Sequence, residues 1–178
     1  MRRFLKVFIS LFIVCFVVGC QQKSQNVFLE KDGELYKIAD QVSFYYPKDY
    51  EVDTSNDNKK LIQFIKDEEV LQYSTSIDDT DNKIEDLPKL YEGQLEEDGA
   101  GDIHYYKVQL DSGIDCYEFM GNYIATGVKF KHVVYFTTDA SYIYSYQSPE
   151  ESYDENIEVI TKYLESLTVH HEVSSSLD

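Results

Sequence analysis

The sequence predicts an α+β domain in which a mostly antiparallel β-sheet, made of hairpins and a four-strand meander, is packed by two helices. The first observation is a series of four apolar segments separated by short polar turns, as in a meander. These segments span 103–110, 114–124, 128–138 and 142–147. Second, hairpin patterns precede them, and third, two stretches carry apolar residues at helical spacing. We expect two layers, with both helices on one face of the sheet.

The N-terminal half is predicted to contain two hairpins and a helix. Lys31-Asp32-Gly33 is a turn of the Asp-Gly type, which favours a hairpin between the segments beside it. Pro47 stops the following strand, and a second hairpin turns at 66–69. The predicted strands are 27–30, 34–39, 42–46, 61–65 and 70–77. The helix ends at 99–101, and its apolar positions are Ile84, Leu87, Tyr91 and Leu95.

A C-terminal helix is predicted to pack on the meander. Ser148 is expected as its N-cap, with Pro149 at the first helical position and Glu151 completing a capping box. The apolar stripe of this helix consists of Tyr153, Ile157, Ile160, Leu164 and Leu167. One domain is therefore expected over 27–169, followed by a flexible polar tail at 170–178.

The segment Phe44-Tyr45-Tyr46-Pro47-Lys48-Asp49-Tyr50 and the order of the elements resemble the PsbP-like fold. That fold opens with an aromatic strand ending in Tyr-Pro and closes with a helix near a Ser-Leu pair, here Ser166-Leu167. The resemblance covers about 42–169, whereas the N-terminal hairpin and the absence of Trp depart from the pattern. It implies a non-catalytic accessory or assembly factor that binds other proteins.

The N-terminus has the pattern of a secretion signal. Basic residues Arg2, Arg3 and Lys6 precede 12 residues, Val7 to Val18, in which only Ser10 is polar. A permanent transmembrane helix needs about 20 apolar residues, so this segment is too short to be one. Residues 1–19 are therefore predicted to be a signal peptide that uses the general secretory route.

The segment Val17-Val18-Gly19-Cys20 resembles the lipobox of bacterial lipoproteins. The resemblance implies cleavage between Gly19 and Cys20 and a covalent diacylglycerol, with fatty acyl chains such as palmitate, on the Cys20 thiol. Residues 20–26 would then be the lipidated cysteine and a polar linker. We expect the protein at the outer face of the cell membrane, and its Lys-rich composition without Arg suggests a Gram-positive organism.

The mature chain would be strongly acidic. Without residues 1–19 it has 13 lysines, no arginine and 33 acidic residues, which gives a net charge of about −20. Phosphates would repel this surface, so nucleic acid is not expected as a partner. With Cys15 removed and Cys20 lipidated, Cys116 is left without a disulfide partner. We expect it to be a small buried residue; a reactive thiol is the alternative.

Local motifs for catalysis or metal binding are missing from the sequence. His132 alternates with apolar residues, which favours a hydrogen-bonded core histidine, and His104 is expected in solvent. The acidic segments 78–82 and 96–98 do not fit the twelve-residue calcium loop, and 170–172 (His-His-Glu) falls in the expected tail. No metal and no cofactor other than the lipid are therefore predicted.

Tyrosine is abundant, with 16 residues, all after residue 19. Tyr142, Tyr144 and Tyr146 share one face of a predicted strand. They could pack within the sheet, or they could form a partly exposed aromatic platform for a partner.

Taken together, these features predict a membrane-tethered, non-catalytic module that binds an envelope protein. The alternative is a small lipoprotein that captures a solute or cation, and a third possibility is an enzyme with an unrecognised site.

Overall fold

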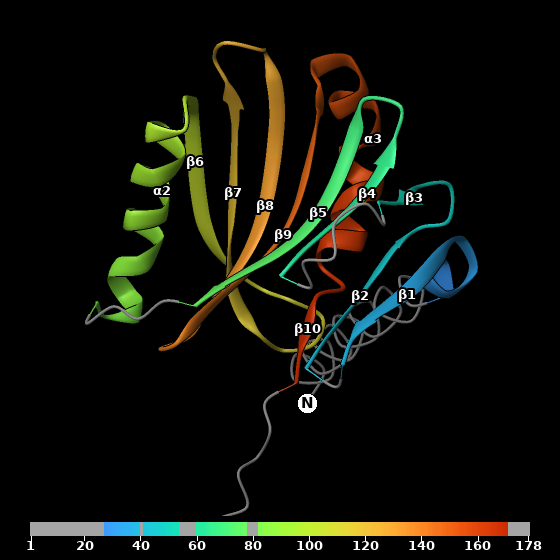
Figure 1. Ribbon diagram of the computed structural model, residues 1–178, viewed down its shortest axis with the longest axis horizontal. Helices are drawn as coiled ribbons and strands as arrows, with labels where there is room; N and C mark the ends of the chain where they lie inside the picture. Colours follow the sequence, from blue (N-terminus) through green and yellow to red (C-terminus); the bar gives the residue numbers. More distant parts are fainter. Residues whose placement is uncertain (1–26, 40, 54–59, 78–81, 171–178) are drawn as a thin grey trace, which may run out of the picture.

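The computed structural model describes residues 27–39, 41–53, 60–77 and 82–170. These residues form two antiparallel sheets and two main helices, which confirms the predicted α+β class (Figure 1). The smaller sheet has the order β1-β2-β10, with strands Gly33–Ile38, Val42–Pro47 and Thr168–Val169. The larger sheet has the order β3-β4-β5-β9-β8-β7-β6. In chain order its strands are Glu51–Val52, Leu61–Lys66, Glu69–Ile77, Ala100–Gln109, Asp115–Tyr123, Val128–Phe136 and Ala140–Pro149.

The meander and the second hairpin are confirmed. Strands β6, β7, β8 and β9 pair in sequence order, and β4 pairs with β5 around a short turn. Gly113 and Gly127 occupy the turns that join β6 to β7 and β7 to β8, with φ values of 83° and 68°. Glycine suits these turns because a Cβ atom disfavours positive φ. Strand β5 then pairs with β9, which joins the hairpin to the meander.

The predicted first hairpin is wrong. Residues 27–32 are helical, and the hairpin forms between β1 and β2 instead. The sequence Lys31-Asp32-Gly33 joins this helix to β1, so the glycine does not serve a hairpin turn. A Cβ atom on Gly33 would lie 2.8 Å from both the Leu29 carbonyl oxygen and the Tyr163 ring. Glycine is therefore required by the close approach of the helix and the Tyr163 ring.

The two main helices lie on opposite faces of the larger sheet, so the prediction that they share a face is wrong. Helix α2 (Leu87–Glu97) follows a 3₁₀ turn, η1 (Ile84–Asp86), and α3 is Glu150–Leu164. On β8, consecutive residues point to opposite faces. The Tyr91 hydroxyl of α2 lies 2.9 Å from His132 Nδ1, whereas Lys131 Nζ donates to Thr161 of α3 at 3.1 Å.

Two separate cores follow from this arrangement. The larger lies between α3, the smaller sheet and one face of the larger sheet, and the smaller lies beneath α2. In the larger core the Phe44 and Tyr144 ring centroids are 4.5 Å apart, which ties β2 to β9. The smaller core consists of Leu87, Leu95, Ala100, Phe119, Phe130, Val134 and Phe136. The apolar stripes of α2 and α3 thus pack against different sides of the sheet, whereas Ile84, expected in the first stripe, lies in the 3₁₀ turn and is exposed.

The predicted start of α3 is also wrong in detail. Ser148 belongs to β9, Pro149 is the N-cap residue, and no side chain caps the helix. The strand continues further than its apolar pattern suggested because Ser148 and Pro149 still pair with β8. Glu150 and Glu151 occupy the first turn, where a negative charge interacts favourably with the helix dipole.

Candidate functional site

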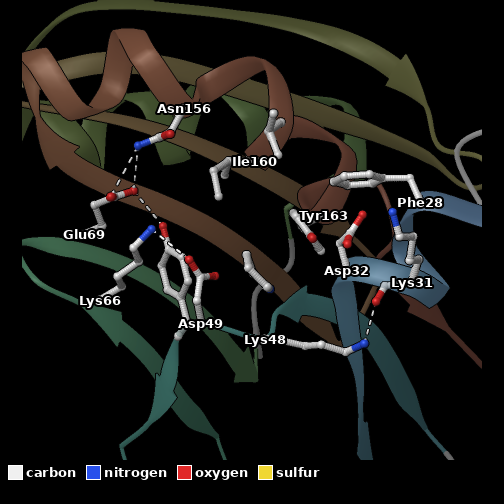
Figure 2. A pocket seen from close by; sticks show the side chains of 13 residues that line it. Phe28, Lys31, Asp32, Lys48, Asp49, Lys66, Glu69, Asn156, Ile160 and Tyr163 are labelled. Atoms are coloured by element: carbon white, nitrogen blue, oxygen red, sulfur yellow. Dashed lines mark hydrogen bonds and ion pairs between the residues drawn. The ribbon is translucent and has the colours of Figure 1, made fainter.

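A pocket of about 420 Å³ opens beside α3 and is the candidate site (Figure 2). Four parts of the chain form it: the helical residues 27–32, the β2–β3 connection, the β4–β5 hairpin and α3. The lining residues are Phe28, Lys31, Asp32, Pro47, Lys48, Asp49, Tyr50, Lys66, Glu69, Asn156, Val159, Ile160 and Tyr163.

Glu69 is the buried acid of this pocket, with 6% of its surface exposed. It lies on the same face of β5 as Leu71 and Tyr73, because side chains alternate along a strand. Its Oε2 atom accepts hydrogen bonds from the Tyr50 hydroxyl at 2.6 Å and the Tyr146 hydroxyl at 2.5 Å. The Asn156 amide donates to both carboxylate oxygens at 3.3 Å. One side chain thus ties the β2–β3 connection, β9 and α3 to the start of β5.

The two tyrosines act only as hydrogen-bond donors toward this carboxylate. Burial, together with the hydrogen bond to Glu69, raises the pKa of Tyr50 and of Tyr146 well above the ordinary value. Both hydroxyls therefore stay protonated near neutral pH. Neither can serve as a general base near neutral pH.

Three lysines also line the pocket: Lys66 lies beside Glu69 and Asp49, and Lys48 and Lys31 lie at the other end (Figure 2). Lys66 pairs with Asp49 at 2.8 Å, and this hydrogen-bonded pair raises the pKa of Lys66 (Figure 2). Lys48 Nζ donates to the backbone carbonyl of Lys31 at 2.5 Å, which holds the β2–β3 connection against the helical residues. The pocket is therefore lined by both ammonium and carboxylate groups.

The remaining wall is apolar and aromatic. The Phe28 and Tyr163 ring centroids are 5.6 Å apart, and Ile160 lies beside them on α3 (Figure 2). Burial raises the pKa of Tyr163 to about 12. Lys162 Nζ lies 5.0 Å from the centroid of the Phe28 ring, a cation–π distance.

The predicted exposed platform of Tyr142, Tyr144 and Tyr146 is wrong. Tyr144 and Tyr146 are fully buried, and Tyr142 is half-buried. The reason is that their face of β9 is covered by the smaller sheet and α3. The Tyr144 hydroxyl donates to the Tyr45 carbonyl at 2.9 Å, so this tyrosine satisfies its polar group inside the core. The packing alternative from the sequence is therefore the correct one for these two residues.

The expected core histidine and buried cysteine are confirmed. His132, a residue of β8, is buried beneath α2, and burial lowers its pKa to about 3. Cys116 is fully buried, and burial raises the pKa of its thiol to about 12. Neither residue lines the pocket. His104 is exposed on β6, as expected.

Within the described residues, no group of three or more His, Cys, Asp or Glu side chains could hold a metal ion. Residues 96–98 end α2 and begin its C-terminal turn. The acidic segment at 78–81 and residues 171–178 fall outside the described part. His170, where the tail was expected to begin, donates from its backbone to the Gln41 carbonyl at 2.7 Å.

Gly19 and Cys20, the expected cleavage and lipidation residues, also lie outside the described residues, as does the whole signal segment. In the part that is described, each helix is too short or too polar to cross a membrane.

The sequence patterns did not identify Glu69 and Asn156 as site residues, and 66–69 was predicted to be a turn. A usable signal was present, because a glutamate continues the inward alternation of Leu71 and Tyr73. Such a glutamate must either be paired or hydrogen-bonded in the fold. Residues 47–50 were singled out only because they resemble part of the PsbP-like fold. The sequence does not show that they lie close to α3.

No protein-family model and no curated protein sequence matches this chain. Solved structures do match its fold. Cyanobacterial PsbP from Synechocystis has a TM-score of 0.57 and 14% identity, over 78% of this chain and 93% of that one. The Ran-binding protein Mog1p of Saccharomyces cerevisiae has a TM-score of 0.52 and 12% identity, over 77% and 95%. A Bacteroides thetaiotaomicron protein has a TM-score of 0.51 and 16% identity, over 79% and 50%. The chain therefore has the PsbP-like fold, as its Tyr-Pro segment and order of elements indicated.

Proposed function

We propose that this protein is a non-catalytic protein-binding module, tethered outside the cell membrane by a diacylglycerol on Cys20. The observation that carries the proposal is the state of the polar groups around the pocket. Glu69 accepts hydrogen bonds from Tyr50, Tyr146 and Asn156, and Asp49 is paired with Lys66. A hydrolytic site needs a nucleophile within reach of a base, and these groups bind one another instead.

Two residues suited to acid–base or nucleophilic chemistry are also inaccessible. His132 and Cys116 are buried, and their pKa values are shifted away from neutrality, to about 3 and about 12. His132 is therefore neutral and Cys116 is a thiol at pH 7. This supports a role in binding over a role in turnover.

The fold and the charge support a protein as the partner. Among the structures with this fold, Mog1p is a Ran-binding protein. A mature chain with a net charge of about −20 would attract a basic surface and repel nucleic acid and anionic lipid. We therefore propose an envelope protein with a basic surface as the partner.

The tether is tested by replacing Cys20 with alanine and fractionating the cells. Because the domain has no other segment suited to membrane insertion among its described residues, the Cys20→Ala protein is expected in the soluble fraction. Cys116→Ala is the matched control, since it removes a buried cysteine and should stay with the membrane. A Cys20→Ala protein that remains membrane-bound would contradict the tether.

The partner is tested by capture from detergent-solubilised envelopes of the source cells. Electrostatic attraction predicts a specific protein at low salt and its loss toward 1 M salt, where the Debye length falls to about 3 Å. Capture that is insensitive to salt would contradict a basic partner. Steady turnover of a cell-wall or phosphoester substrate by the purified protein would contradict the non-catalytic assignment.

A further inference from the structure

We propose that the pocket beside α3 binds a short zwitterionic peptide such as a dipeptide, a function separate from protein binding. The ligand's ammonium group would contact Glu69, and its carboxylate would contact Lys48 and Lys31. Its side chain would pack on the apolar wall formed by Phe28 and Ile160 (Figure 2).

The Glu69 carboxylate has the hydrogen-bonding capacity to accept an ammonium group. Its Oε2 atom receives the two short tyrosine hydrogen bonds and a 3.3 Å bond from Asn156, whereas from the described residues its Oε1 atom receives only the other 3.3 Å bond from Asn156. A carboxylate has about four acceptor positions, so Oε1 can accept further hydrogen bonds. No lysine of the described residues lies within 4 Å of this carboxylate. Neutral donors thus orient this buried carboxylate, while Lys66 is paired with Asp49, which together with the Glu69 charge raises the pKa of Lys66.

The end of the pocket that holds Lys48 and Lys31 can accept a carboxylate. Lys48 Nζ donates one hydrogen bond, to the Lys31 carbonyl, and an ammonium group has three donors. Lys31 lines the same side of the pocket, close to Asp32 and Phe28 (Figure 2). Lys66 lies beside Glu69 and is already paired with Asp49 (Figure 2).

The charge balance of the lining selects a zwitterion over an ion of one sign. The lining contains three lysines and three acidic residues, although the mature chain has 13 lysines against 33 acids. A cation alone would meet the lysines, and an anion alone would meet Asp32, Asp49 and Glu69. A molecule that carries both charges can pair with each set.

The size and apolar wall limit the ligand further. A volume of about 420 Å³ lies at the lower end of the usual range for ligand pockets, roughly 300–1,000 Å³. Val159, Ile160 and the Tyr163 ring offer an apolar surface to one side chain. A dipeptide with an aliphatic side chain is therefore the expected ligand.

The test is calorimetric titration of the full chain, purified in detergent, with leucyl-alanine. Binding is expected, together with at least a tenfold loss when the peptide is N-acetylated and a comparable loss when its carboxylate is amidated. Absence of heat with leucyl-alanine at 10 mM would overturn the proposal. Equal binding of the acetylated peptide would overturn it as well.

Variants then locate the site. Glu69→Gln should weaken binding by at least tenfold, and Lys48→Gln should do the same without touching the Glu69 hydrogen bonds. Lys89→Gln, an exposed lysine of α2 outside the pocket, makes the same charge change and should bind normally. If Glu69→Gln does not fold, Lys48→Gln decides: unchanged affinity in that variant overturns the site. Since no membrane or partner protein enters this test, its failure would leave the proposed protein binding and tether unaffected.

Discussion

The buried ion pair between Lys131 and Glu118 should respond strongly to loss of one partner. Their charged atoms are 2.9 Å apart, and the side chains are only 7% and 4% exposed. Replacing Lys131 with methionine would leave the Glu118 carboxylate buried without a counter-ion. Such changes cost about 3–5 kcal/mol. The Tyr106 hydroxyl still donates to Glu118 at 2.6 Å, so we expect the lower end, about 3 kcal/mol.

Urea denaturation measures this cost. The midpoint should fall with an unchanged m-value, which would show that stability and not the compactness of either state has changed. Lys129→Met is the matched control, because this lysine points to the same side of β8 and pairs with Glu150 and Asp154, both well exposed. Its loss should cost at most about 1 kcal/mol.

A double variant separates the effect of the unpaired Glu118 charge on stability from the effect of the changed side-chain shape. With Lys131→Met and Glu118→Leu together, no buried charge is left unpaired, and most of the lost stability should return. A cost below about 1 kcal/mol for Lys131→Met alone would refute the reasoning, since that is the value of an exposed pair.

Three further predictions concern buried groups. His132 has a folded pKa of about 3, below the 6.5 of an unfolded histidine, so the unfolded state binds the proton first. Its contribution to stability is complete above pH 6.5 and falls by up to about 1.4 kcal/mol per pH unit as the pH drops toward 3. His132→Phe should therefore reduce the slope of stability against pH in that window, and an unchanged slope would contradict a neutral buried histidine. Cys116 should resist a thiol reagent in the native protein and react in urea; rapid native labelling would show that it is accessible. Gly33→Ala should lower stability by about 1–3 kcal/mol because its methyl group meets the Leu29 carbonyl and the Tyr163 ring, and a neutral result in thermal melting would mean that the helix can shift.

The sequence predicted the meander and the C-terminal helix well because their signals are local. Polar turns such as 111–113 and the repeat of Ile157, Ile160 and Leu164 depend only on neighbouring residues. The first hairpin was wrong because Asp32-Gly33 has the composition of a turn, while the real need for glycine comes from the Leu29 carbonyl and from Tyr163, 130 positions away. Only tertiary contact distinguishes the two uses of glycine.

The sequence also did not show which helix covers which face of the larger sheet. The alternation along β8 identifies two faces but does not say which helix covers each one, and the assumption of a single covered face failed. The exposed tyrosine platform failed for the same reason, since a strand that is buried on both faces has no solvent side. The pocket depends on Glu69 meeting residues from three distant segments, which no periodicity in the sequence can reveal.

The pairing of β10 with β2 has a consequence for the order in which the protein folds. Val169 pairs with Val42, and Ser166 Oγ accepts a hydrogen bond from the Tyr45 backbone, across 121 positions of sequence. The hairpin of β1 and β2 can form early, but its inner face stays uncovered until α3 and the residues through Val169 have been synthesised. Closing such long loops is slow compared with forming local contacts. Folding of this domain is therefore expected to finish in a late, rate-limiting step, and a chain shortened before Thr168, which leaves the edge of β2 unpaired, should expose the aromatic side of β2 to aggregation.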